Sequence, residues 1–348
     1  MKEETRELWK LCFGDSDDFL DLYFSRKYRD EINSCIVRDG RIVSALQRIP
    51  YVMNFKGDVI HSSYISGACT HPDFRSQGLM RELLAQAHRR MYSDGAGLAM
   101  LIPAEESLKE YYARSGYAVC FARGRKTWDK NREPQDRKSS GDWSFHTVDL
   151  LKFPNEEIVR FVADKLGKLD VCIMHDADDL YTIMRDLDLS GGQMWCVRNR
   201  AGEVAALALC TKKEEELEVK ELLYDDKRVE EETVDYLLNY YDAERMICTV
   251  APDEGKTVFM GMARIINVFD VLGIYAVHTG ENLLVEVCGD DVITENNGLY
   301  QIGNGHCIKT ERPRISENQE ENIVRLDIGQ LPAFLFKGTR PYMNLMLD

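Results

Sequence analysis

The sequence lacks the features that mark a membrane protein or a secreted one. No stretch approaches the roughly 18 uninterrupted apolar residues of a membrane-spanning helix. The N-terminal residues Met1 to Glu7 are acidic and have no apolar core, so they do not form a signal peptide. From these two absences we predict a cytoplasmic protein with no membrane partner.

Metal-binding and disulfide patterns are also missing. The 10 cysteines are scattered, with no Cys-x-x-Cys pair and no Cys/His cluster at zinc spacing. Most of them lie in apolar, strand-like runs, which predicts buried, reduced thiols and no metal cofactor.

Clusters of basic residues are scarce. The chain has 59 Asp and Glu against 44 Lys and Arg, a formal net charge of -15. Nucleic-acid binding requires clustered Lys and Arg, so we predict no nucleic-acid partner. The excess of acid agrees weakly with a cationic substrate, because most surface carboxylates are simply solvated.

The length of 348 residues suffices for two or three domains. A polar stretch over 129–141 is broken by Pro134 and Gly141 and has no apolar face, which predicts a linker or a long surface loop. The stretch places one boundary near residue 130, and the family resemblance described below implies three domains, at 1–130, 131–252 and 253–348.

The most informative segment runs from Ser66 to Met80. A strand-like run ends at a His-Pro pair, turns through Arg75 to Gly78, and continues into a run with helical apolar spacing. A helix N-terminus presents unpaired N–H groups and partial positive charge, and a glycine there lets the backbone approach an anion closely. The segment predicts a binding site for a pyrophosphate.

This segment resembles the motif of the GCN5-related N-acetyltransferase (GNAT) superfamily, Val-x-Pro-x-x-Arg-x-x-Gly-x-Gly/Ala, which holds acetyl-CoA. Thr70 takes the valine position, Arg75 and Gly78 match, and Met80 replaces the final small residue. A bulky apolar residue there, after a His-Pro pair, resembles the Eis-type subfamily. The resemblance implies acetyl-CoA as co-substrate, with contacts from Ala68, Cys69, Thr70, Arg75, Ser76, Gln77, Gly78, Leu79 and Met80.

The Eis-type resemblance implies two tandem GNAT folds followed by a smaller sterol-carrier-like (SCP2-like) domain. The predicted fold class is therefore α/β (α+β), with mixed, mostly antiparallel sheets flanked by helices. For the first copy we expect helices over 5–12, 17–28, 78–94 and 106–114 and strands over 34–37, 42–51, 59–70 and 98–102. For the second copy we expect helices over 155–167, 176–187 and 229–241 and strands over 194–198, 204–211 and 217–224. In the last domain we expect strands over 283–288 and 298–302.

The turn after the strand at 217–224 differs from the first one. Asp225 and Asp226 stand where the first turn has its arginine and glycine, and adjacent carboxylates would repel a pyrophosphate. We expect the second copy to be structural and the chain to have a single cofactor site.

A tyrosine is the candidate general acid. The superfamily pattern Tyr-x-x-x-Gly-Phe/Tyr aligns Tyr112, Gly116 and Tyr117 with the family's acid and the residues after it. A tyrosine, with a pKa near 10, can donate a proton to a departing thiolate. Tyr111 points about 100° away on a helix, so we expect it to pack in the core.

The general base is less clear from the sequence. Many superfamily members carry a Glu on the strand before the phosphate loop, yet the run 59–70 has no carboxylate. Glu105 and Glu106 are candidates, or they are ordinary acids in the first turn of a helix. Eis-type enzymes use their C-terminal carboxylate, which implies a catalytic role for Asp348, while water acting as the base stays open.

The predicted function is acetyl-CoA-dependent N-acetyl transfer to a primary amine, by direct attack in a ternary complex. The acceptor would be a small cationic amine, an aminoglycoside-like molecule or a lysine side chain of a peptide. Two alternatives stay open: a lipid or hydrophobic-ligand binding protein, and a non-catalytic acetyl-CoA sensor. The Eis-type resemblance also implies a homo-oligomer.

Overall fold

The computed structural model describes residues 1–131, 142–310 and 323–347. The chain forms two compact units, each built from segments that are distant in the sequence. Unit 1 contains Met1–Phe121 and Phe259–Pro341, and unit 2 contains Ala122–Val258 and Tyr342–Leu347. The division into three domains stays a prediction, and most of the predicted linker lies outside the described residues.

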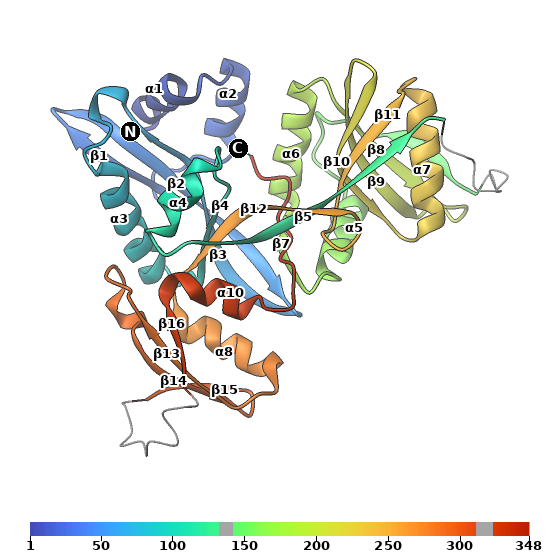
Figure 1. Cartoon of the computed structure of the whole chain (residues 1–348). Coiled ribbons are helices and arrows are strands. Elements are labelled where there is room, and N and C mark those ends of the chain that lie inside the picture. Colours follow the sequence, from blue (N-terminus) through green and yellow to red (C-terminus); the bar gives the residue numbers. More distant parts are fainter. Residues whose placement is uncertain (132–141, 311–322, 348) are drawn as a thin grey trace. The chain divides into compact units, whose positions relative to one another are not determined.

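The first part of unit 1 is a sheet with helices packed against it (Figure 1). Its elements are, in order, α1 (Lys2–Phe13), α2 (Asp17–Arg26), β1 (Asn33–Arg38), β2 (Arg41–Phe55), β3 (Asp58–Thr70), the short 3-10 turn η1 (Pro72–Phe74), α3 (Leu79–Ser93), β4 (Leu98–Leu101), α4 (Ser107–Ala113) and the first residues of β5 (Ala118–Asp129).

Strands β1, β2 and β3 pair antiparallel, and β3 pairs parallel with β4 over Ser62–Tyr64. A strand from much later in the chain then joins this sheet. Residues Met262–Ile265 of β12 (Lys256–Ile265) pair antiparallel with β4. The sheet of the first fold is therefore completed by residues that follow the second fold.

The two faces of this sheet bury different helices, because successive residues of a strand point in opposite directions. Ala45 of β2 packs with Leu8 of α1, whereas the next residue, Leu46, packs with Leu83 and Leu84 of α3. The apolar residues of α3 recur at helical spacing, which fits one buried stripe.

The rest of unit 1 is a small four-stranded sheet in the order β15-β14-β13-β16, against which α8 packs. Its elements are α8 (Val268–Thr279), β13 (Leu283–Cys288), η2 (Thr294–Asn296), β14 (Gly298–Gly303), β15 (His306–Thr310), β16 (Ile323–Asp327), η3 (Ile328–Gln330) and α10 (Leu331–Leu335). The strands expected at 283–288 and 298–302 are present, and the sterol-carrier-like assignment stays a prediction.

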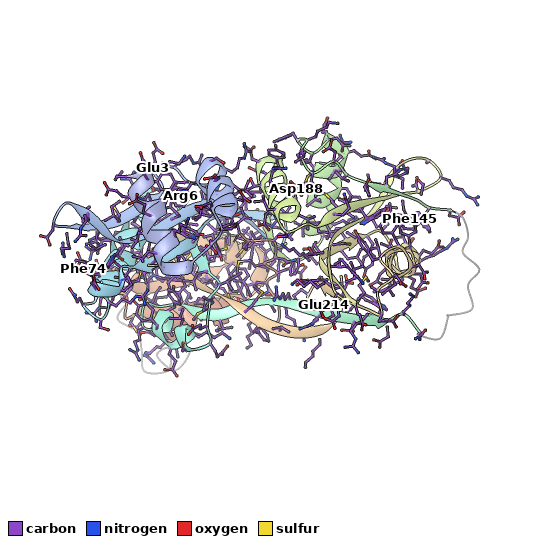
Figure 2. All side chains as sticks on the ribbon, turned by 90° about the horizontal axis from the view of Figure 1, so that it is seen from above. Glu3, Arg6, Phe74, Phe145, Asp188 and Glu214 are labelled. Atoms are coloured by element: carbon purple, nitrogen blue, oxygen red, sulfur yellow. The ribbon has the colours of Figure 1, made fainter. Side chains whose placement is uncertain are left out.

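The strands of unit 2, in the order β11-β10-β9-β8-β6, are covered by helices on both faces. Helices α5 and α6 pack on one face, and α7 packs on the other. Phe145, labelled in Figure 2, lies on the α7 side. Its ring stacks on that of Tyr236, with ring centroids 3.9 Å apart. Besides the rest of β5 and the start of β12, the elements of unit 2 are β6 (Ser144–Thr147), α5 (Glu156–Gly167), β7 (Val171–Met174), α6 (Ala177–Leu189), β8 (Gln193–Arg198), β9 (Val204–Lys213), β10 (Glu216–Tyr224), α7 (Lys227–Tyr240) and β11 (Arg245–Val250).

The second unit repeats the strand pairing of the first. Strands β8, β9 and β10 pair antiparallel, and β10 pairs parallel with β11, as β3 does with β4. Each third strand also contains a bulge beyond its parallel pairing. Gly67 and Ala68 of β3 lie opposite the single residue Leu46, and Lys220 of β10 is the extra residue on its side. The predicted class, tandem α/β folds with mixed sheets, is confirmed.

Six of the ten cysteines are buried, as predicted, but Cys288 is exposed. Within the described ranges no helix is long and apolar enough to cross a membrane. The same residues contain no group of three or more His, Cys, Asp or Glu side chains placed to hold a metal ion.

Candidate active site

The loop between β3 and α3 has the backbone shape of an anion cradle. Ser76 and Gly78 both have left-handed backbone angles, with φ of 61° and 79°. Such residues, alternating with right-handed or extended ones, turn successive N–H groups toward one concave side. For Ser76 this conformation is uncommon, which suggests a functional constraint on the loop.

The N-terminus of α3 has no side-chain cap. Gly78 is the N-cap residue, and it has no side chain that could accept a hydrogen bond from the first turn. The N–H groups of that turn and the positive end of the helix dipole are therefore available to an anion. Arg75 adds positive charge, and its Nε donates to the Thr70 carbonyl at 3.1 Å.

The bulge in β3 shapes the strand that leads to the loop. Gly67 has a φ of 60°, and a Cβ there would lie 2.0 Å from the ring of Trp9, so only glycine fits. Parallel pairing with β4 is recorded up to Tyr64, while β3 continues to Thr70. The last residues of β3 thus offer a backbone edge beside the loop, suited to a ligand with amide groups of its own.

Tyr112 lies on α4 and belongs to the core under α3. It is 9% exposed and belongs to one core cluster with Leu79, while Met80 and Ala68 pack against the same cluster. Burial, with a smaller effect from Tyr111, raises the pKa of Tyr112 to about 12. The hydroxyl is therefore protonated at neutral pH and can donate a proton or a hydrogen bond.

A buried histidine and tyrosine lie next to Tyr112. The Tyr117 ring is 5.9 Å from the Tyr112 ring in an edge-to-face arrangement. The Tyr117 hydroxyl lies 2.9 Å from Nε2 of His88. Burial lowers the pKa of His88 and raises the pKa of Tyr117, so both are neutral. Sequence reasoning did not connect His88 with the site, because its partner is contributed by another element.

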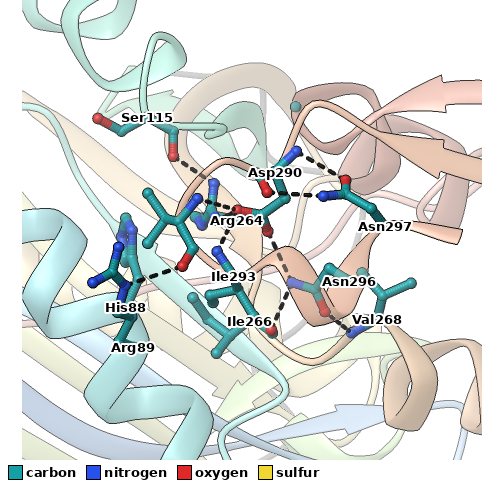
Figure 3. Close-up of polar contacts among 12 residues, drawn as sticks. His88, Arg89, Ser115, Arg264, Ile266, Val268, Asp290, Ile293, Asn296 and Asn297 are labelled. Atoms are coloured by element: carbon teal, nitrogen blue, oxygen red, sulfur yellow. Dashed lines mark hydrogen bonds and ion pairs between the residues drawn. The ribbon is translucent and has the colours of Figure 1, made fainter.

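An arginine from β12 holds the end of the helix that carries Tyr112 (Figure 3). Arg264 donates through one terminal nitrogen to the Ser115 carbonyl at 2.9 Å and through the other to Asp290 at 2.7 Å. The guanidinium packs on Gly116, where a Cβ would lie 2.2 Å from its nitrogen. A cation suits this place, because the last carbonyls of a helix lack partners within the helix.

Asp290 is the centre of the same network. Its carboxylate also accepts from the backbone N–H groups of Val292 and Ile293 and from the side chain of Asn296. Asn296 in turn donates to the Ile266 carbonyl at 2.9 Å. Residues beyond position 260 thereby fix the position of α4.

The candidate bases differ in their surroundings. Glu105 and Glu106 are exposed, and Glu106 forms an ion pair of 2.7 Å with Lys109 on the first turn of α4. Asp348 lies outside the described residues. The residues before it are anchored in unit 2, where Tyr342 exchanges backbone hydrogen bonds with Val171 and Ile173.

The second strand–helix turn, in unit 2, is capped by the chain itself. Asp226 is the N-cap of α7, and its carboxylate accepts from the N–H groups of Arg228 at 2.8 Å and Val229 at 3.1 Å. A carboxylate already occupies the position that an anionic ligand would take. This geometry supports the prediction of a single cofactor site.

The side chains of the predicted contact residues differ in accessibility. Arg75, Ser76, Gln77 and Gly78 are exposed in the loop. Cys69 is 5% exposed, so its side chain points into the core and only its backbone is available to a ligand. Thr70 is half-buried, and its hydroxyl lies 2.9 Å from the hydroxyl of Ser44.

Comparison with known proteins identifies the first part of the chain. Residues 2–120 match the family model described as an acetyltransferase (GNAT) domain. No curated protein matches the sequence. Residues 2–120 are thus similar to an acetyltransferase domain, which supports the predicted acyltransferase class.

Solved structures show the same fold over nearly the whole chain. A probable N-acyltransferase from Enterococcus faecalis is 14% identical, with a TM-score of 0.79 over 96% of this chain and 87% of its own. A GCN5-related N-acetyltransferase from Anabaena variabilis is 15% identical, with a TM-score of 0.76 over 95% and 86%. An Eis protein from Mycobacterium abscessus is 11% identical, with a TM-score of 0.73 over 97% and 87%.

Proposed function

We propose that this protein transfers an acetyl group from acetyl-CoA to a primary amine, with Tyr112 as the general acid. One observation carries the proposal. Tyr112 and the first α3 residue, Leu79, belong to one core cluster, against which Met80 and Ala68 also pack, and Gly78 leaves the N-terminus of α3 without a side-chain cap. The candidate anion site and the candidate proton donor are thus built on the same core.

Each part of acetyl-CoA has a matching element in this proposal. The pyrophosphate binds the N–H groups of the loop from Arg75 to Gly78 and the first turn of α3. The pantetheine amides pair with the backbone edge of β3 beyond Tyr64. The thioester then lies near the hydroxyl of Tyr112.

The reaction is attack of a neutral amine on the thioester carbonyl, followed by departure of the CoA thiolate. Loss of a proton from an alkyl ammonium of pKa about 10.4 costs on the order of 4 to 5 kcal/mol at pH 7, so a base must take it. The Tyr112 hydroxyl, with a pKa near 12, donates a hydrogen bond to the sulfur as negative charge develops there.

For the base we retain Glu105, Glu106, Asp348 and a bound water as candidates. In the pH profile of kcat/KM, the variant that removes the base loses the rate increase on the acidic limb. The variants to compare are Glu105→Gln, Glu106→Gln, Asp348→Asn and a deletion of Asp348. A profile unchanged in all four indicates water.

The role of Tyr112 is tested with Tyr112→Phe, which removes only the hydroxyl. We expect kcat to fall by about tenfold or more while the Kd for acetyl-CoA stays within about twofold. Tyr111→Phe is the matched control, since that neighbouring tyrosine packs against the same cluster and should tolerate the change. Equal kcat values for wild type and Tyr112→Phe would disprove the role.

The acceptor is tested by following free thiol release with acetyl-CoA and a panel of amines. The panel contains polyamines, aminoglycosides and lysine peptides, the cationic classes that the net charge of -15 favours. Binding of acetyl-CoA without thiol release from any amine would favour a sensor. Binding of fatty acids but not acetyl-CoA would favour a hydrophobic-ligand protein. Cytoplasmic location and homo-oligomerisation stay predictions.

A further inference from the structure

Two cysteines meet beside the anion loop. Cys12, near the end of α1, has its sulfur 3.5 Å from the Thr70 carbonyl at the end of β3. Cys69, the residue before Thr70, belongs to a core cluster with Leu8, Ile42 and Ala45, and Cys12 packs against the same cluster. Two cysteines from elements that are distant in sequence thus share one packed cluster beside the end of β3.

The two thiols have unequal surroundings. Cys12 is half-buried, whereas Cys69 is buried. The hydrogen bond from Cys69, with the nearby Arg75 guanidinium, lowers the pKa of Cys12 to about 6, against the opposing effect of burial. The same hydrogen bond and burial raise the pKa of Cys69. One accessible thiolate beside one protected thiol is the arrangement of an attacking and a resolving cysteine.

We propose that Cys12 and Cys69 are a redox modification site that hydroperoxides oxidise to a disulfide, which weakens acetyl-CoA binding at the adjacent loop. The thiol pair itself needs no acetyltransferase activity. The effect on acetyl-CoA rests on the proposed function.

The chemistry is a two-electron oxidation. The Cys12 sulfur attacks one oxygen of the hydroperoxide, the O–O bond breaks, and the leaving oxygen takes a proton to give water or an alcohol. Cys12 is then a sulfenic acid. The Cys69 sulfur attacks the Cys12 sulfur, the S–O bond breaks, and hydroxide leaves with the Cys69 proton as water. Two thiols are oxidised and one hydroperoxide is reduced.

Arg75 couples this pair to the ligand site. Its guanidinium lowers the pKa of Cys12, and its Nε donates to the Thr70 carbonyl at 3.1 Å, the same carbonyl that the Cys12 sulfur contacts. A disulfide removes the thiolate that Arg75 stabilises and brings the sulfurs to about 2.05 Å, which draws the end of α1 toward the end of β3. Conversely, a bound pyrophosphate attracts Arg75 away from Cys12. Oxidation and acetyl-CoA binding should therefore oppose each other, and the opposition is reciprocal.

The test uses the full-length reduced protein treated with hydrogen peroxide. We expect peptide mass spectrometry to show a Cys12–Cys69 disulfide, the Kd for acetyl-CoA to rise about tenfold, and dithiothreitol to reverse both. Saturating acetyl-CoA should slow the oxidation severalfold. In Cys12→Ser, peroxide should no longer change the Kd.

Cys35→Ser is the matched control, because Cys35 packs against the same cluster and should leave the response intact. Oxidation of the exposed Cys288 while Cys12 and Cys69 stay reduced would overturn the proposal, as would a disulfide that leaves the Kd unchanged. If the reduced protein does not bind acetyl-CoA at all, the proposed function is wrong instead. Peptide mass spectrometry still tests whether the disulfide forms.

Discussion

The two strand–helix turns of this chain have the same backbone features but differ in the residue at the helix N-terminus. Both β3 and β10 pair in parallel, contain a bulge, and lead into a helix. In unit 2, side chains of the protein form the hydrogen bonds at both features. Asp226 caps α7, and Asn344 donates to the Lys220 carbonyl at the bulge at 2.7 Å. In unit 1, Gly78 leaves α3 without a side-chain cap.

The difference shows which features make such a turn a ligand site. The fold provides the bulge and the helix dipole in both units, so neither feature is sufficient. The residue at the N-cap decides whether the positive helix end is available, because a carboxylate there takes the N–H groups that a phosphate would need. Function in this chain therefore depends on a side chain that is missing at Gly78 and present at Asp226.

The largest expected effect comes from converting the first turn into the second. In Gly78→Asp, the new carboxylate would cap α3 and repel the pyrophosphate, and aspartate tolerates the left-handed backbone better than most residues. The Kd for acetyl-CoA should rise about a thousandfold, by loss of charge-assisted hydrogen bonds plus repulsion. Titration calorimetry measures it.

Gly78→Asn is the control for charge, since asparagine caps a helix without repulsion. We expect it to weaken binding by about tenfold, and a cooperative melting transition in both variants would show that the fold persists. Tight acetyl-CoA binding by the Asp variant would refute the importance of the open N-terminus.

The next largest expected effect is on the pH dependence of stability, and it depends on Glu221, a buried carboxylate of β10 that has no counterpart in β3. Glu221 is buried in unit 2, accepting hydrogen bonds from Tyr342 at 2.9 and 2.7 Å and from Asn344 at 2.8 Å. Burial raises its pKa from 4.5 to about 7. The folded state thus keeps a proton that the unfolded state loses, so the stability of unit 2 decreases as the pH rises from 4.5 to 7.

Glu221→Gln imitates the protonated carboxyl at every pH. The free energy of unfolding of this variant, relative to wild type, should rise by up to about 3 kcal/mol between pH 4.5 and 7.5. Urea unfolding followed by the fluorescence of the buried Trp195 measures it. Glu218→Gln, on the same strand but paired with Lys213 at the surface, should show no such pH trend. An equal trend in both would assign the effect to net charge.

The smallest effect comes from opening the second turn. Asp226→Ala removes the cap of α7 and should lower the free energy of unfolding by about 1 kcal/mol. Asp225→Ala removes only an ion pair with Lys165 and should change it by less than about 0.5 kcal/mol. We expect one acetyl-CoA per chain in every case, because Asn344 still occupies the bulge. A stoichiometry of two for Asp226→Ala would mean that the cap alone closed the second site.

The sequence predicted what depends on local signals. Turn chemistry and apolar spacing predicted α1, α3 and β3 to within a few residues of their observed bounds. From the adjacent carboxylates of Asp225 and Asp226 the sequence predicted that the second turn repels a phosphate. The structure adds that Asp226 caps α7. These features depend on neighbours in the chain, which a sequence displays directly.

Features set by distant partners were not predicted. Strand β12 completes the sheet of the first fold by pairing with β4, although some 155 residues separate Leu101 from Lys256. Arg264 was interpreted as part of the last domain, yet it holds the helix of Tyr112. The contact of Cys12 with the Thr70 carbonyl joins α1 to β3 in the same way. Such pairs depend on tertiary packing, which local propensity does not encode.

The interleaving of the two units has a consequence for synthesis on the ribosome. The core beneath α3 includes Met262, Ile266 and Ile293, so it remains incomplete while only the first 260 residues have been made. Unit 2 in turn awaits Tyr342, which lies in its own core. Neither unit can finish folding when its first segment emerges, because unit 1 must wait for Ile293 and unit 2 for Tyr342. Dependence on chaperones during translation should therefore be greater than for a chain whose domains follow one another in sequence.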